Sequence, residues 1–256
     1  MSLNLESMRA KLDASKNGTK SNGKNSTMWR PKAGDQNIRI LPTKDGDPFR
    51  EFHFHYNVGK NPGIYCNKRN DSGECAICDF ASKLWREGVE SDDTTLKNEA
   101  KKLFARKRYY SPVLVRGAES EGVKIWAYGK TAYETLLGYV LDPDYGDVTD
   151  AETGTDIKLN YSIPGTPGSF PKTILQPRRR PSVLCDDTIA NCQDLLDSVP
   201  DIDGLFDRKT PEEIQGLLDG YLSSDSSAEG SSSETAQYKK PSGDVDQAFA
   251  AFMKSE

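Results

Sequence analysis

The alternation of apolar and polar residues predicts β-strands along much of the chain. It is clearest at 49–58, where aromatic residues take alternate positions and His53 and His55 lie between them. Because side chains repeat every two residues along a strand, the two histidines are expected to share one face. Similar patterns begin at Ile38 and cover 103–115, 123–128 and 157–163. These segments predict a mainly β core.

Apolar residues at helical spacing predict helices between and after the strands. The first helix has one apolar stripe, formed by Ile77, Phe80, Ala81, Leu84 and Trp85. Further helices are predicted at 131–140, 189–199 and 212–222, the last preceded by a Thr-Pro pair that is typical of a helix start. The segment 164–180 is rich in Pro and Gly and is expected to be a surface loop or flap.

These patterns divide the chain into four regions. Residues 1–27 predict a short helix and a flexible arm, and residues 28–221 predict the folded core. In 222–243, eight of 22 residues are serine, which is typical of a disordered linker. The last region, 244–256, is an acidic amphipathic peptide expected to bind partner proteins through Asp244, Asp246, Phe249 and Phe252.

Charge is distributed unevenly along the chain. The net charge of −5 combines residues 1–130, with 24 Lys/Arg and 16 Asp/Glu (+8), and the other 126 residues, with 10 and 23 (−13). This asymmetry indicates a polyanion-binding part followed by an acidic appendage. The chain has no apolar run long enough to span a membrane and no apolar run of a signal peptide at its start, so neither a membrane span nor secretion is predicted.

Three of the five cysteines have the spacing of a metal site. Cys66, Cys75 and Cys78 lie within thirteen residues, and the only histidines, His53 and His55, precede them. A Cys-x2-Cys turn directs two thiolates at one point, so a closed tetrahedral Cys3His site for one structural Zn²⁺ is predicted. The residues and their spacing leave open whether His53 or His55 is the fourth ligand.

The remaining two cysteines give no metal signal. Cys185 and Cys192 lie seven residues apart, and without a secretion signal we expect thiols in a reducing compartment, with these two as small buried residues. A catalytic zinc of the deaminase type is not expected, because the His-x-Glu that such a site needs is replaced here by His53 followed by His55.

A basic and aromatic stretch predicts binding to single-stranded nucleic acid. Cations contact the phosphates, while aromatic faces stack bases without reading their sequence. Each aromatic residue taken singly is equally compatible with a strand core. The predicted contact residues are Arg106, Lys107, Arg108, Tyr109, Tyr110, Trp126, Tyr128 and Lys130, together with Arg178, Arg179 and Arg180 in the acidic half.

These motifs resemble the replication single-stranded DNA-binding proteins of T-even bacteriophages and their cyanophage relatives. The most specific parts are Ile38-Arg39-Ile40-Leu41-Pro42 with Lys44, the His/Cys set, and the segment 106–115 leading to Trp126, Gly129 and Lys130. The resemblance covers about 5–256. It implies an OB-fold core with α-helices and an inserted zinc subdomain at about 53–90, and it favours His55 as the ligand.

The resemblance also implies a function and partners. A non-enzymatic protein is expected to coat single-stranded DNA in the cytoplasm of an infected bacterium, during replication, recombination and repair. It would associate with itself along the strand and bind phage polymerase, helicase-loading and recombination proteins through its tail. The compact Lys-Arg-Lys-Ser-Thr self-association motif of the family is absent, and Lys24-Asn25-Ser26-Thr27 is a diluted version. The alternatives are an RNA-binding or zinc-ribbon interaction module and a zinc-dependent nucleic-acid enzyme.

Overall fold

The computed structural model describes residues 27–59, 61–165, 170–186, 189 and 191–225. Within them the chain forms two compact units. Unit 1 contains 27–50 and 110–205, and unit 2 contains 51–109 and 206–225. Unit 2 is thus inserted in the sequence of unit 1 and completed by the C-terminal part of the described chain. Among the described residues, no helix is long and apolar enough to cross a membrane.

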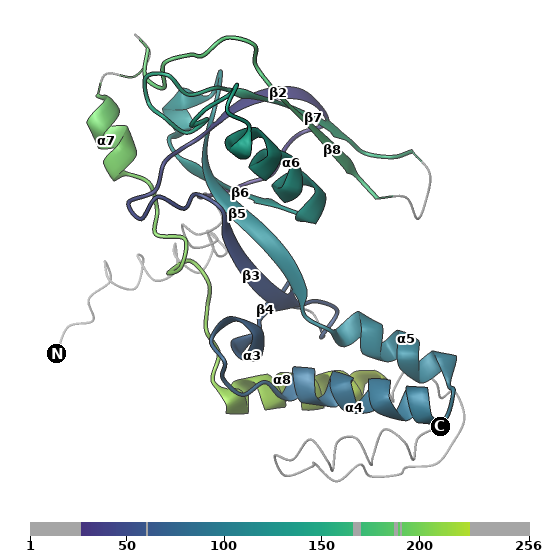
Figure 1. Ribbon diagram of the computed structural model, residues 1–256. Coiled ribbons are helices and arrows are strands. Elements are labelled where there is room, and N and C mark those ends of the chain that lie inside the picture. Colours follow the sequence, from purple (N-terminus) through teal and green to yellow (C-terminus); the bar gives the residue numbers. More distant parts are fainter. Residues whose placement is uncertain (1–26, 60, 166–169, 187–188, 190, 226–256) are drawn as a thin grey trace, which may run out of the picture. The chain divides into compact units, whose positions relative to one another are not determined.

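Unit 1 is built on a sheet with the strand order β1-β6-β5-β2-β7-β8, and Figure 1 labels all of these strands except β1. The register is antiparallel where Ile40 faces Val113 and where Leu159 faces Leu175, and it is parallel between β1 and β6. The bounds are β1 Met28–Trp29, β2 Gly34–Ile40, β5 Arg106–Val115, β6 Lys124–Tyr128, β7 Ile157–Ser162 and β8 Lys172–Pro177.

One strand lies where the sequence predicted a loop or flap. Within 164–180, residues Lys172–Pro177 form β8 and pair with β7 along its whole length. Leu175 is buried while its neighbours Ile174 and Gln176 are exposed, so the segment has a strand pattern over only three residues. So short an alternation is a weak strand signal, and the surrounding Pro and Gly residues favoured the prediction of a loop. The segment forms a strand because it pairs with β7.

A buried ion cluster lies between the strands of unit 1. Arg39 of β2 is fully buried, its Nε lies 3.5 Å from Asp156, and it donates to the carbonyl oxygen of Ser182. Arg116 contacts the same carboxylate at 3.1 Å. Burial lowers the pKa of Arg39, and the charge of Asp156 opposes this effect. The shared carboxylate thus offsets part of the cost of removing two guanidinium groups from water.

The helices of unit 1 include α6 (Lys130–Leu141) and α7 (Cys192–Asp197), and the short 3-10 helix η1 (Glu119–Glu121) connects β5 to β6. The helix predicted at 131–140 is confirmed, and the one predicted at 189–199 is shorter than expected. Tyr139 of α6 donates to the carbonyl oxygen of Leu175, 2.8 Å away, and so contacts β8.

Unit 2 combines the strands β3 (Arg50–His55) and β4 (Ile64–Tyr65) with the helices α3 (Asn67–Asn70), α4 (Ala76–Glu90), α5 (Thr94–Leu103) and α8 (Pro211–Asp225). Figure 1 shows α8 beside α4. The predicted α4 and α8 are confirmed. Thr210 and Glu213 form the capping box of α8, with bonds of 2.8 and 3.3 Å between backbone N–H groups and side-chain oxygens.

Helix α5 was missed by the sequence analysis, which expected a strand from residue 103. Leu96, Ala100 and Leu103 recur at helical spacing and are buried against α4. The Asp93 side chain caps the helix by accepting hydrogen bonds from the N–H groups of Thr95 and Leu96. Apolar residues at helical spacing and an Asp cap are ordinary helix signals. The strand β5 begins at Arg106, three residues after α5 ends at Leu103.

The predicted mainly β core with C-terminal helices and an inserted Cys/His subdomain is confirmed. The segment expected at 53–90 lies inside the larger unit 2. Helix α8 extends to Asp225, and Leu222 is part of its buried face. The N-terminal arm at 1–26, most of the Ser-rich linker, and the tip with Asp244, Asp246, Phe249 and Phe252 lie outside the described residues.

Candidate metal centre and nucleic-acid interface

Three elements of unit 2 bring one histidine and three cysteines together. His55 ends β3, Cys66 follows β4, Cys75 precedes α4, and Cys78 lies in its first turn. The antiparallel pairing places His55 opposite Ile64 and so brings the strand ends together. All four side chains are buried, and their ligand atoms lie within 4.8 Å of one another.

The donor atoms have the chemistry and spacing of a tetrahedral metal site. The Sγ atoms of Cys66 and Cys78 are 3.4 Å apart, and the Nε2 atom of His55 lies 3.3 Å from Cys75 Sγ. The Nδ1 atom of His55 lies 2.7 Å from the carbonyl oxygen of Leu103, so Nδ1–H can donate there while Nε2 faces the sulfurs. The cluster can hold one metal ion.

His53 lies outside this cluster. Its backbone N–H donates to Asn70 Oδ1 at 2.8 Å, its carbonyl oxygen accepts from Asn70 Nδ2 at 3.0 Å, and its Nδ1 lies 3.3 Å from Asn70 Oδ1. The structure therefore groups His55, and not His53, with the three cysteines. The missed helix α5 explains the selection in part, because it supplies the carbonyl oxygen that orients the His55 ring.

Without a metal ion, the pKa values of His55, Cys66 and Cys78 are shifted by their neighbours in the cluster. Burial lowers the pKa of His55, but hydrogen bonds to Cys66 and Cys75 outweigh burial and raise it to about 10. Hydrogen bonds from Cys75 and Cys78 lower the pKa of Cys66, whereas those to Cys66 and Cys75 raise the pKa of Cys78. The thiolate of Cys66 is thus favoured and that of Cys78 is opposed, and a bound divalent cation would stabilise the thiolate form of its ligands.

The other two cysteines differ from expectation. Cys185 and Cys192 form a disulfide with their Cα atoms 5.6 Å apart, and both are half-buried. The prediction of small buried thiols is therefore wrong for this pair. Their separation of seven residues is compatible with free thiols or with a disulfide. In the fold, the chain turns back so that Cys192, at the start of α7, lies next to Cys185. Cys66, Cys75 and Cys78 are free thiols.

The predicted basic residues lie at exposed positions of both units. In unit 2, Arg106 and Lys107 at the start of β5 are exposed, and Lys107 Nζ lies 2.9 Å from Glu51. Arg108 is half-buried. In unit 1, Lys130 is exposed with its Nζ 3.4 Å from Glu134. The run Arg178, Arg179 and Arg180 is exposed after β8, and the described part of the chain shows no ion pair to it.

The predicted aromatic residues are buried in this structure. Their exposed fractions are 5% for Tyr109, 5% for Tyr110, 1% for Trp126 and 4% for Tyr128. The ring of Trp126 lies 4.4 Å from that of Tyr128, between centroids, and packs edge-on against the half-buried Trp29. These rings belong to the core in the structure, and stacking on bases would require them to become exposed.

Comparison with known proteins identifies the family. Residues 32–218 match the family model described as gp32 DNA binding protein like. This chain belongs to the gp32-like DNA-binding family. A search of the curated proteins finds no match. The matched range contains the four residues of the metal centre, the predicted cations and all four predicted aromatic positions, and so places them within a DNA-binding domain.

One exposed aromatic residue of this gp32-like chain was missed by the sequence analysis. Phe170 lies between β7 and β8 and is 86% exposed, more than any other large hydrophobic residue in the described chain. Ile163 and Ile174, on the same hairpin, are also exposed. A lone phenylalanine in a Pro- and Gly-rich segment gives no sequence signal, and the hairpin becomes recognisable only through the pairing of β8.

Proposed function

We propose that the protein binds single-stranded DNA without sequence preference in a phage replication, recombination and repair machinery. The observation that carries the proposal is the gp32-like match over 32–218. The exposed basic clusters of both units support it, because phosphate contacts supply most of the affinity of sequence-independent binding. The protein would act in the cytoplasm of the infected host.

The phosphate contacts are assigned to the predicted cations, which are exposed except for the half-buried Arg108. Arg106, Lys107 and Arg108 would contact the strand in unit 2, and Lys130 with Arg178, Arg179 and Arg180 would contact it in unit 1. Apart from Lys130, the first residue of α6, none of these cations lies on a helix, which favours a backbone-tracking mode over readout of base edges in a groove.

Base stacking is assigned to one exposed ring and to four buried ones. Phe170 presents an exposed ring two residues before the exposed Lys172, so this segment could supply one stacking face and one phosphate contact. Stacking on Tyr109, Tyr110, Trp126 and Tyr128 remains part of the proposal but needs a conformation in which these rings leave the core. Phosphate contacts therefore have the larger role.

The cluster of His55, Cys66, Cys75 and Cys78 is proposed to hold one structural Zn²⁺. Sulfur and imidazole donors are those that zinc prefers, and four protein ligands leave no position open for a reacting water. Three of these residues belong to the same buried cluster as Ile77 and the helices α4, α5 and α8. The metal would supply folding free energy to unit 2 rather than chemistry.

The proposal also includes protein partners. The tip with Asp244, Asp246, Phe249 and Phe252 would bind phage polymerase, helicase-loading and recombination proteins, and the arm at 1–27 would support self-association along the strand. Both assignments rest on the sequence and on the family.

Competition between nucleic acids tests the proposed function. The full-length protein is mixed with a labelled oligodeoxynucleotide at one fixed salt concentration and challenged with unlabelled single-stranded DNA, duplex DNA or RNA of equal length. Single-stranded DNA of several unrelated sequences should compete about equally, and duplex at least about tenfold less well. Preference for RNA or for one DNA sequence would contradict the proposal, and nucleolytic products would show an enzyme instead.

Deleting residues 226–256 should tighten DNA binding only slightly. The segment carries five acidic and three basic residues, a net charge of −2, so its competition with DNA for the basic clusters is weak. We expect about threefold higher affinity at 0.05 M salt and no difference at about 0.3 M, where charges are screened. The deletion starts after Asp225 because Leu222 belongs to the core of unit 2. Unchanged affinity at low salt would show that the tail does not compete with DNA.

A further inference from the structure

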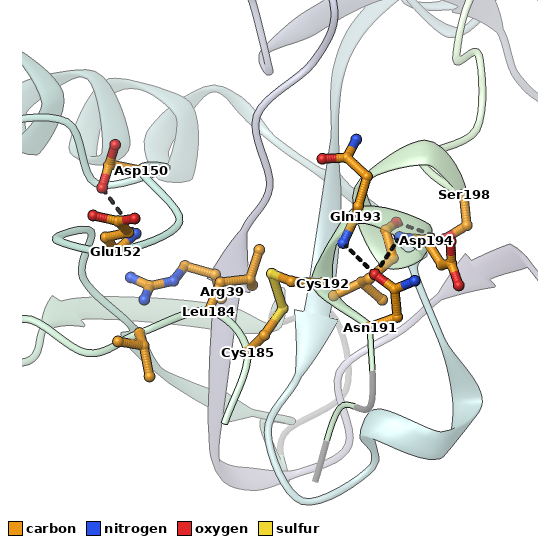
Figure 2. Close-up of a disulfide and its surroundings, with 12 residues drawn as sticks. Arg39, Asp150, Glu152, Leu184, Cys185, Asn191, Cys192, Gln193, Asp194 and Ser198 are labelled. Atoms are coloured by element: carbon orange, nitrogen blue, oxygen red, sulfur yellow. Dashed lines mark hydrogen bonds between the residues drawn. A yellow bond between two sulfur atoms is a disulfide. The ribbon is translucent and has the colours of Figure 1, made fainter. Parts of the chain in front are cut away.

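The disulfide of unit 1 joins two segments that are held in different ways. Cys185 follows Leu184, which is fully buried with Leu41 and Leu114. Cys192 is the first residue of α7. Figure 2 shows the sulfur–sulfur bond beside Leu184, with the cap of α7 on its other side. The bond therefore connects a segment anchored in the core to a short surface helix.

The segment before the disulfide is fixed by bonds that do not involve sulfur. Arg116 donates to the carbonyl oxygens of Val183 and Leu184 at 2.9 and 2.8 Å. The buried Arg39 donates to the carbonyl oxygen of Ser182. Breaking the disulfide leaves these charge-assisted hydrogen bonds in place, so this segment is expected to remain attached.

Helix α7 has fewer means of attachment. It spans six residues, which is too short for a helix that is stable by itself. Its cap, Asn191, accepts from the N–H groups of Gln193 and Asp194 at 3.0 and 3.4 Å, and this stabilises the helix without holding it to the unit. Besides Cys192 itself, its residues packed against the core are the half-buried Leu195 and Leu196, and Val199 adds a contact just after the helix. Docking of α7 thus depends on modest packing and on the disulfide.

We propose that Cys185 and Cys192 are a thiol–disulfide exchange site that controls the docking of α7. Both are half-buried, so a small disulfide such as oxidised glutathione can reach them. One cysteine thiolate attacks it and releases a first small thiol, and the second cysteine attacks the mixed disulfide and releases another. The two cysteines lose two electrons and two protons, which the two released thiols carry.

Oxidation and docking must favour each other to the same extent. A docked α7 holds the two sulfurs close together, which favours the disulfide, and the disulfide in turn keeps α7 near its packing site. Because the coupling between two equilibria is reciprocal, a substitution that weakens docking lowers the equilibrium constant of disulfide formation. The three free cysteines of unit 2 are not part of this equilibrium.

A glutathione titration of the full-length protein tests the coupling. Samples at set ratios of reduced to oxidised glutathione are quenched with acid and alkylated, and peptide mass mapping gives the oxidised fraction of this pair. Leu196→Ala, which removes packing, should lower the equilibrium constant about fivefold. Gln193→Ala, an exposed position on the same helix, should change it by less than about twofold. Equal constants for Leu196→Ala and the unaltered protein would overturn the proposal.

Hydrogen exchange supplies a second readout that does not depend on a substitution in α7. Reducing the pair should speed exchange of the amides of Leu195 and Ser198 while those of β2 stay unchanged. The double variant Cys185→Ser/Cys192→Ser should behave as the reduced protein does. Identical exchange of α7 in both redox states, or a pair that stays reduced at every glutathione ratio, would refute the switch.

Discussion

Replacing Cys75 with Ser should abolish stoichiometric zinc binding and lower the thermal midpoint of unit 2 by about 10 °C. A hydroxyl is a poor zinc ligand, so three of the four donors remain around the ion. Cys75 is fully buried in the cluster that contains Ile77 and Phe80, and loss of the metal removes the bonds that would join the buried donor groups there. A loss of about 4 kcal/mol corresponds to about 10 °C for a chain of this size.

Metal analysis and calorimetry check this result, and hydrogen exchange shows where stability is lost. Protection of α4 amides should fall, while that of β2 and β7 in unit 1 should not. His53→Asn is the matched control, because His53 lies in the same strand as His55 but contacts Asn70 instead of the sulfurs. This variant should keep one zinc per chain. Loss of zinc in His53→Asn, or an unchanged midpoint in a zinc-free Cys75→Ser protein, would contradict the assigned ligand set or its structural role.

Replacing Arg178, Arg179 and Arg180 together by Ala should reduce single-stranded DNA affinity about 100-fold at 0.1 M salt. For single strands, each phosphate contact makes the plot of log affinity against log salt concentration steeper by about 0.7. Three contacts therefore account for a slope of about −2. Relative to 1 M salt, where this contribution vanishes, they raise affinity about 100-fold at 0.1 M salt. The side chains are exposed, and the bond from Arg178 to Asp156 joins backbone atoms, so the substitutions should leave the fold intact.

The salt dependence separates a direct contact from a general charge effect. The control is the triple variant Arg69→Ala/Arg86→Ala/Lys102→Ala, which removes the same charge from exposed positions on α3, α4 and α5. Its affinity should fall by less than about threefold at 0.1 M salt, because exposed charges away from the strand are screened. Equal slopes for the two triple variants would show that the arginine run does not contact phosphates.

Most local structure could be predicted from the sequence because its signals are local. The stripe that includes Ile77 and Leu84 predicted α4, and the Thr-Pro pair predicted the start of α8. The elements that were missed had weak or contradicted signals. Helix α5 has three buried positions among mostly polar residues, and β8 stands among Pro and Gly residues, so packing against α4 and pairing with β7 decided both.

The sequence also determined much of the candidate metal site. Three cysteines within thirteen residues and two histidines on the preceding strand limited the donors to five. The choice between His53 and His55 needed the register of β3 with β4 and the carbonyl oxygen of Leu103, which lies 48 residues away from His55. No spacing rule contains such a contact.

By itself, therefore, the sequence determined the kinds of chemistry present. It supplies sulfur and imidazole donors for one metal ion, and enough closely spaced cationic side chains to bind a polyanion. The tertiary structure decided which of those side chains are available. It buried Tyr109, Tyr110, Trp126 and Tyr128, exposed Phe170, and joined Cys185 to Cys192. The physical reason is that a residue's type fixes what its side chain can bind, whereas its exposure and partners depend on segments that are distant in the chain and meet only on folding.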